Sequence, residues 1–104
     1  MDAVRDDKGK PNIWYVPRAA INAMARVFEF GAKKKYHAYN YKTGKGLDWN
    51  RVYDSALRHL LAWNDGEDTD PESGMSHLWH AITNTAMLID LIELGKGREY
   101  RFNK

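Results

Sequence analysis

The stretch from Asp70 to Gly95 constrains the fold more than any other part of the chain. Asp70 followed by Pro71 is typical of a helix start, because aspartate can cap free amides and proline fits the first turn. We expect one helix from this point to Leu94, ended by Gly95. At about 100° per residue, one side of this helix carries Met75, Leu78, Trp79, Ile82, Ala86, Ile89 and Ile92.

The same predicted helix is apolar on a second side. Leu88 and Leu91 lie there, in line with the polar residues His77, His80 and Asn84. A helix with two apolar sides must be covered on both, and three helices of this length cover one another poorly. We therefore predict a homo-oligomer whose subunits complete the bundle.

Two further helices are predicted upstream. The first spans about residues 17–30, with Pro17 in its first turn and Gly31 just past its end. The second spans about Trp49–Asn64 and ends before Gly66. No stretch of useful length alternates polar and apolar residues, so no strand is expected. The predicted fold class is all-α, a small bundle with three main helices.

The chain is long enough for one domain. Residues 1–11 are polar and are expected to form a flexible N-terminal arm, followed by a single all-α domain over residues 12–104. Residues 31–50 are rich in Lys, Tyr, Asn and Gly and are predicted to form a long loop. Such a long loop in a small domain is usually functional.

Composition excludes several classes of protein. The chain has no cysteine, which removes disulfides, thiolate nucleophiles and cysteine–zinc sites. No apolar run approaches the roughly 20 residues that cross a bilayer, and the N-terminus has no apolar signal-peptide core. We therefore expect a cytoplasmic protein without a membrane partner.

The charge is small in sum but uneven along the chain. Sixteen Lys and Arg against 14 Asp and Glu give a net charge of +2, too little for a protein that binds long nucleic acids. Residues 31–45 nevertheless hold five lysines and no acid, and residues 65–72 hold five acids and no base. This pattern suits a small phosphorylated ligand.

Three histidines are predicted to point inward. His77 and His80 share a stripe with Asn84, and His59 falls on the apolar stripe Val52–Ala56–Leu60–Trp63 of the preceding helix. They either line a ligand site, through hydrogen bonding, stacking or metal ligation, or are structural groups satisfied within the core. The sequence leaves these two interpretations equal.

The acidic turn GEDTDPES is a candidate metal site. Glu67, Asp70 and Glu72 could hold a hard cation such as Mg²⁺ through oxygen ligands. Helix capping explains Asp70 well and is the preferred role for it. For Glu67 and Glu72 two roles remain possible: binding a metal ion, or simple exposure to solvent. If the protein is an enzyme, Glu67 and Glu72 are the expected catalytic pair, holding Mg²⁺ and positioning a water.

The lysine-rich loop alternates cations with aromatic rings. Lys34 and Lys35 are followed by Tyr36, Asn40 and Tyr41. Cations neutralise phosphate, rings stack on bases and asparagine pairs with an adenine edge. A lysine run is usually a solvated face, but this combination favours a nucleotide over a bare anion.

Three segments of the chain resemble a known family. They read YVPRAAINAMA, RVFEFGAKKKYHAYNYKTG and ALRHLLAWNDGEDTDPESGMSHLWHAITNTAML, and they cover about residues 13–90. The pattern is similar to the phage family of the dATP/dGTP diphosphohydrolase N-terminal domain, which is related to MazG-like all-α nucleotide pyrophosphohydrolases. Those enzymes bind Mg²⁺ and split a (d)NTP into monophosphate and pyrophosphate. The positions that match the family's motifs are Lys34, Tyr36, Asn40, Arg58, His59, Trp63, Glu67, Asp70, Glu72, Ser73, His77, His80 and Asn84.

The chain departs from the MazG-like pattern at the metal ligands. Those enzymes hold metal with a paired E-x-x-E motif and a later E-x-x-D, all on helices. This chain has no E-x-x-E, and its E-x-x-D, Glu67 to Asp70, falls on the predicted turn. Pyrophosphate cleavage normally needs Mg²⁺ clamped by several carboxylates, so the resemblance supports nucleotide binding better than hydrolysis.

Together these features predict a phage-type protein that binds a purine nucleotide between its second and third helices. It would lie in the host cytoplasm if phage-encoded and use Mg²⁺ if catalytic. One alternative is a non-catalytic sponge that sequesters a nucleotide immune signal of the host, and another is an oligomerising partner of a larger hydrolase. The expected contacts are Lys34, Lys35 and Arg58 for phosphate, Tyr36, Tyr41 and Trp63 for the base, and Asn40, His59, His77, His80 and Asn84 for base or ribose.

Overall fold

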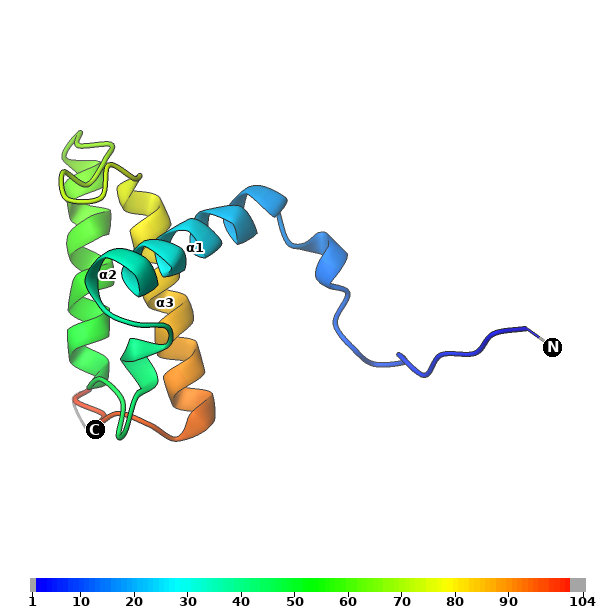
Figure 1. Cartoon of the computed structure of the whole chain (residues 1–104). Helices are drawn as coiled ribbons and strands as arrows, with labels where there is room; N and C mark the ends of the chain where they lie inside the picture. Colours follow the sequence, from blue (N-terminus) through cyan, green and yellow to red (C-terminus); the bar gives the residue numbers. More distant parts are fainter. Residues whose placement is uncertain (1, 102–104) are drawn as a thin grey trace.

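The computed structural model describes residues 2–101 (Figure 1). Met1, the first residue of the predicted arm, and residues 102–104, the last of the predicted domain, lie outside the described residues. Within that range the chain forms helices and no strand, which confirms the predicted all-α class. The main helices are α1 (Arg18–Phe30), α2 (Trp49–Asn64) and α3 (His77–Leu94).

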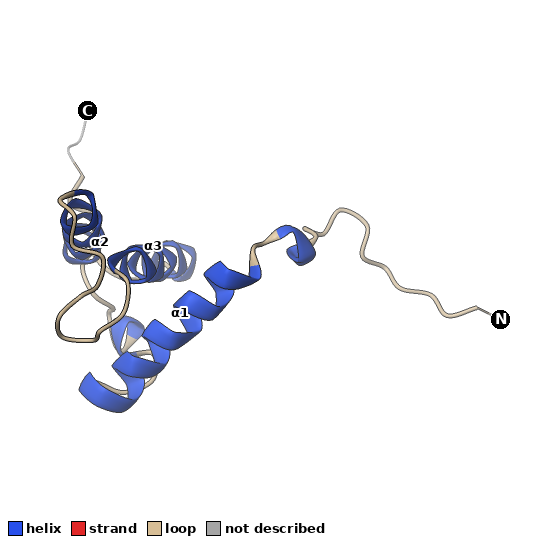
Figure 2. Ribbon diagram, turned by 90° about the horizontal axis from the view of Figure 1, so that it is seen from above, coloured by secondary structure: helices blue, strands red, loops and turns tan. Residues whose placement is uncertain are grey.

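Helices α2 and α3 lie side by side and antiparallel, and α1 crosses them on one side (Figures 1 and 2). Helix α1 packs mainly against α3. Residues 2–12 are exposed and run away from the helices. They lead into a single 3₁₀ turn, Ile13–Tyr15, which begins at Asn12. Across residues 2–101 no helix combines the length and apolarity needed to cross a membrane.

The predicted first helix has the right bounds but continues beyond them. Gly31 adopts a right-handed helical conformation, with φ −61° and ψ −42°. The chain then makes a π-helical turn, Gly31–Lys35, closed by the Tyr36 N–H donating to the Gly31 carbonyl at 2.7 Å. The predicted end of the α-helix before Gly31 is therefore confirmed, whereas residues 31–35 of the predicted loop are helical, because glycine accepts this conformation and the alanine and lysines that follow favour helix.

Helix α2 has the predicted bounds, Trp49–Asn64, and Gly66 follows it with φ +102°. Its inward stripe is only half right. Val52 and Ala56 are buried, whereas Leu60 and Trp63 are each 44% exposed. Helix α1 packs mainly against α3, so α3 is the main neighbour of α2 and part of the apolar surface of α2 stays exposed.

The predicted start of α3 was wrong. The helix begins at His77, after Ser76, whose hydroxyl accepts the Leu78 N–H at 3.1 Å. Asp70 instead closes a tight turn, accepting the Ser73 N–H on its carboxylate at 2.9 Å and the Gly74 N–H on its carbonyl at 2.7 Å. Gly74 then reverses the chain with φ +73°. An Asp-Pro pair suits a turn as well as a helix start.

The core lies where the loop after α1, residues 31–48, meets the start of α2 and the end of α3. Tyr41, Val52 and Leu91 are buried together there, and Leu91 is 0% exposed. The Tyr41 hydroxyl also donates to Asp90 Oδ2 at 2.6 Å, and Lys42 Nζ donates to the same oxygen at 2.9 Å. These contacts hold the loop against α3.

The segment after α3 fixes the same loop from the other side. The Gly97 N–H donates to the Lys45 carbonyl at 2.7 Å, and Lys96 Nζ donates to the Lys42 carbonyl at 2.7 Å. Gly97 has φ +81°, and a Cβ there would collide with the Leu47 carbonyl and the Trp49 ring. Only glycine therefore fits where the segment passes under α2.

Candidate functional site

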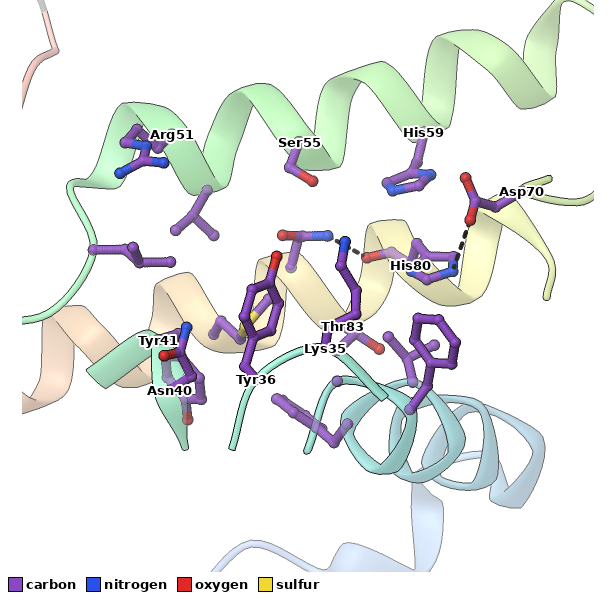
Figure 3. A pocket seen from close by; sticks show the side chains of 18 of the residues that line it. Lys35, Tyr36, Asn40, Tyr41, Arg51, Ser55, His59, Asp70, His80 and Thr83 are labelled. Carbon is purple, nitrogen blue, oxygen red and sulfur yellow. Dashed lines mark hydrogen bonds and ion pairs between the residues drawn. The ribbon is translucent and has the colours of Figure 1, made fainter. Parts of the chain in front are cut away.

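A cavity of about 830 Å³ opens between α2, α3, the end of α1 and the loop that follows α1 (Figure 3). Its volume lies within the range of small-molecule sites, about 300–1,000 Å³. Side chains from each of these elements line it, so the loop supplies part of the cavity wall. Most of the polar residues singled out from the sequence lie on its wall.

Nine of the eleven predicted nucleotide contacts line the cavity, and two do not. Lys34 and Trp63 lie outside the set of lining residues. Of the three acids, Asp70 and Glu72 line the cavity and Glu67 does not. The nine lining residues are Lys35, Tyr36, Asn40, Tyr41, Arg58, His59, His77, His80 and Asn84.

Two histidines from different helices meet at one end of the cavity. His59 Nδ1, on α2, lies 2.8 Å from His77 Nδ1, at the first position of α3. The other ring nitrogen of His77, Nε2, lies 2.6 Å from Glu67 Oε1. His77 is only 4% exposed. Because a carboxylate only accepts, it assigns a proton to His77 Nε2 and directs Nδ1 toward His59.

The third histidine stacks on the first. The His80 ring lies parallel to the His59 ring, with centroids 4.5 Å apart and an angle of 12°. His80 Nε2 lies 2.7 Å from Ser73 Oγ and 3.9 Å from Asp70 Oδ2. One turn further along α3, the Asn84 amide donates to the His80 carbonyl at 2.9 Å. The three residues of the predicted polar stripe of α3 all line the cavity, His77 and Asn84 buried and His80 half-buried.

Burial, together with repulsion from neighbouring histidines, keeps the His59 and His80 rings uncharged. Burial lowers the pKa of His59 to about 4, helped by the neighbouring His80 and His77. Burial also lowers the pKa of His80, although Asp70 opposes that change. Both rings therefore carry a free nitrogen lone pair at neutral pH.

The acids of the predicted magnesium site are directed to different partners. Glu67 Oε1 accepts a hydrogen bond from His77 Nε2. Glu72 Oε1 accepts one from Lys35 Nζ at 3.0 Å, and the Asp70 carboxylate accepts one from the Ser73 N–H. Burial opposes ionisation of Asp70, but the hydrogen bonds from Ser73 outweigh it and lower its pKa. The carboxylates of Glu67, Asp70 and Glu72 do not converge, so they do not fit a shared Mg²⁺ site as arranged.

Basic and aromatic side chains also line the cavity. Lys35 and Tyr36 come from the segment after α1, and Arg51 comes from α2 (Figure 3). Arg58, also on α2, lines the cavity as well. The hydrogen bond to Glu72 raises the pKa of Lys35, against the effect of burial, so that this cation persists. The cavity therefore pairs positive charge with an aromatic ring that is 58% exposed.

Sequence reasoning missed Arg51 and Ser55, which line the cavity from α2. Their signal was present, because Arg51, Ser55, Arg58 and His59 repeat at helical spacing and share one side of the helix. The apolar spacing of α2 indicates only its core-facing side, whereas these polar residues form a second side that faces the cavity.

These features define an all-α protein with a polar cavity between two antiparallel helices and a basic loop. The family model described as dATP/dGTP diphosphohydrolase, N-terminal, matches residues 2–101. The chain belongs to this family, as its three sequence motifs predicted.

One relative is a dATP/dGTP diphosphohydrolase of Salmonella phage PMBT28. It is 27% identical over 92 residues, which are 88% of this chain and 30% of the phage protein. The chain thus spans less than a third of that relative's length. No solved structure matches the chain significantly.

Proposed function

We propose that this chain binds a purine nucleoside triphosphate in the cavity, as the substrate-binding part of a nucleotide pyrophosphohydrolase. The observation that carries the proposal is the gathering of Lys35, Arg51 and Arg58 with the exposed ring of Tyr36 around one cavity. Cations suit the phosphates, and the ring suits a base. The similarity to a phage dATP/dGTP diphosphohydrolase supports a purine deoxynucleotide as the ligand.

The second candidate function is sequestration of a nucleotide without cleavage. It is favoured by the arrangement of the acids, because Glu67 and Glu72 are occupied by His77 and Lys35 and are not grouped around a common point. A phage could use such a domain to withdraw a nucleotide signal made by host defence. Both functions need the same binding cavity and differ only in the fate of the ligand.

A single incubation separates the two functions. The protein is mixed with dATP, dGTP or cyclic nucleotides and a divalent metal, then denatured, and the nucleotides are resolved by chromatography. Monophosphate and pyrophosphate are the expected products of a pyrophosphohydrolase and would contradict sequestration. Intact nucleotide recovered only after denaturation supports sequestration, and nucleotide that never associates with the protein would refute both proposals.

We also propose that two copies pair through the side of α2 and α3 that faces away from the cavity. The apolar residues on it line no part of the cavity, and their side chains carry no charge that would repel an identical surface. The exposed residues are Tyr53, Leu57, Leu60, Leu61, Leu78, Ile82, Ile89 and Ile92.

Light scattering at micromolar concentration tests this pairing. The expected mass is twice the 12.0 kDa of one chain. Ile89, which is 59% exposed, should be essential, so Ile89→Asp is expected to give a monomer by placing a charge in the interface. The matched control is Ile21→Asp on α1, which should leave the mass unchanged. A wild-type mass of 12.0 kDa would contradict the proposal.

A further inference from the structure

Among the described residues, one group of side chains brings three ligand atoms of metal-binding type together. Each of His59, Asp70 and His77 has such an atom within 4.8 Å of the others. The three residues come from α2, from the turn before α3 and from the first position of α3. They line one end of the cavity, so an ion held by them would be reachable from it.

The hydrogen bonds around the group resemble those of metal-binding histidines. A histidine that binds metal through one ring nitrogen commonly donates the other N–H to a carboxylate, which fixes the ring and raises its basicity. Glu67 does this for His77, with Oε1 2.6 Å from Nε2 in a ring that is 4% exposed. His77 Nδ1 is thereby left as an acceptor, and His59 Nδ1 donates its hydrogen to it when no ion is bound. When an ion binds, that hydrogen would move to His59 Nε2, so that both Nδ1 atoms offer a lone pair.

The separation of the two nitrogens indicates the coordination geometry. Two nitrogens 2.8 Å apart, each about 2.1 Å from one ion, subtend roughly 85° at that ion. This is close to the right angle of an octahedral site and well below a tetrahedral angle. Two imidazoles and one carboxylate in octahedral arrangement, with open positions, are typical of first-row transition ions, whereas Mg²⁺ prefers oxygen ligands alone.

We propose that His59, Asp70 and His77 form a binding site for a divalent transition ion such as Mn²⁺ or Co²⁺, with Glu67 positioning His77. The site replaces the all-carboxylate Mg²⁺ site that the acidic turn suggested. Its open positions face the cavity that holds Lys35 and Glu72. It rests on the three ligands alone, so the metal site and the proposed nucleotide binding can fail separately.

The test uses the whole chain and the metal alone, without nucleotide. Titration calorimetry with Mn²⁺ and absorption spectroscopy with Co²⁺ are expected to give one bound ion per chain, with Mg²⁺ binding much more weakly. His59→Ala and Asp70→Asn should each abolish or strongly weaken binding. Glu67→Gln should weaken it about 10- to 100-fold, as expected for loss of a carboxylate that orients a ligand.

Two choices keep the experiment decisive. Asp70→Asn retains an oxygen that accepts the Ser73 N–H, so it decides the matter if His59→Ala fails to fold by circular dichroism. His37→Ala removes an exposed histidine from the loop, outside the three ligands, and should bind metal like the wild type. Absence of Mn²⁺ and Co²⁺ binding, equal affinity for Mg²⁺, or undiminished binding by folded Asp70→Asn would each overturn the proposal.

Discussion

Leu91→Ala is expected to lower the free energy of unfolding by about 2–5 kcal/mol, the usual cost of emptying a fully packed leucine site. Leu91 is 0% exposed and packs with Tyr41 and Val52, where the loop meets the helix pair. A domain of this size is stabilised by only about 5–15 kcal/mol. The substitution therefore removes a large share of the total stability and loosens the loop that forms one wall of the cavity.

The measurement is urea denaturation at one fixed protein concentration, so that any self-association contributes equally. Leu94→Ala is the matched control, because it makes the same change on the same helix at a side chain that is 49% exposed. Its expected cost is below about 1 kcal/mol. Equal losses for the two variants would show that the core is not centred on Leu91.

Lys35→Ala is expected to weaken binding of dATP or dGTP at least about 10-fold, because a charge-assisted hydrogen bond contributes about 1.5–3 kcal/mol. Lys35 lines the cavity, its Nζ lies 3.0 Å from Glu72 Oε1, and its raised pKa keeps it charged. Its side chain is partly exposed, so salt should reduce the effect. Titration calorimetry at two salt concentrations measures both quantities.

The same run of lysines provides the control. Lys33 pairs with Glu29 at 3.5 Å on the exposed side of the helical turn and does not line the cavity. Lys33→Ala removes the same charge and should bind nucleotide like the wild type. Because Lys35→Ala also frees Glu72, the double variant with Glu72→Gln separates loss of the cation from the added negative charge. Equal weakening by Lys33→Ala would mean that net charge alone attracts the ligand.

The sequence predicted a helix boundary correctly where the local residues favour only one conformation. The bounds of α2 followed from its apolar spacing and the glycine after it. The start of α3 did not, because Asp70 and Pro71 serve a turn as well as a helix, and only the reversal at Gly74 with φ +73° excludes a helix there. Helix α1 ends before Gly31 as predicted, but the π-helical turn that follows was not predicted, because a glycine marks the end of a helical path only when it adopts the left-handed conformation.

The candidate site was predictable in part for a similar reason. Helical spacing placed His77, His80 and Asn84 on one face, and all three line the cavity. Glu67 and His77 are brought into contact by the turn between them, and the spacing of residues along a helix cannot predict a contact made across a turn. The sequence therefore grouped the acids with one another, whereas the structure pairs Glu67 with a histidine.

The attachment of the cavity loop to the segment after α3 also links two distant parts of the molecule. The loop carries Tyr36 and Asn40 on the cavity wall, and beyond them it is tied to Lys96 and Gly97 by backbone and side-chain hydrogen bonds. Segments tied in this way open together and exchange their amide hydrogens together. A ligand that immobilises the wall therefore slows opening at the C-terminal segment, which then reports on occupancy of the cavity without touching the ligand.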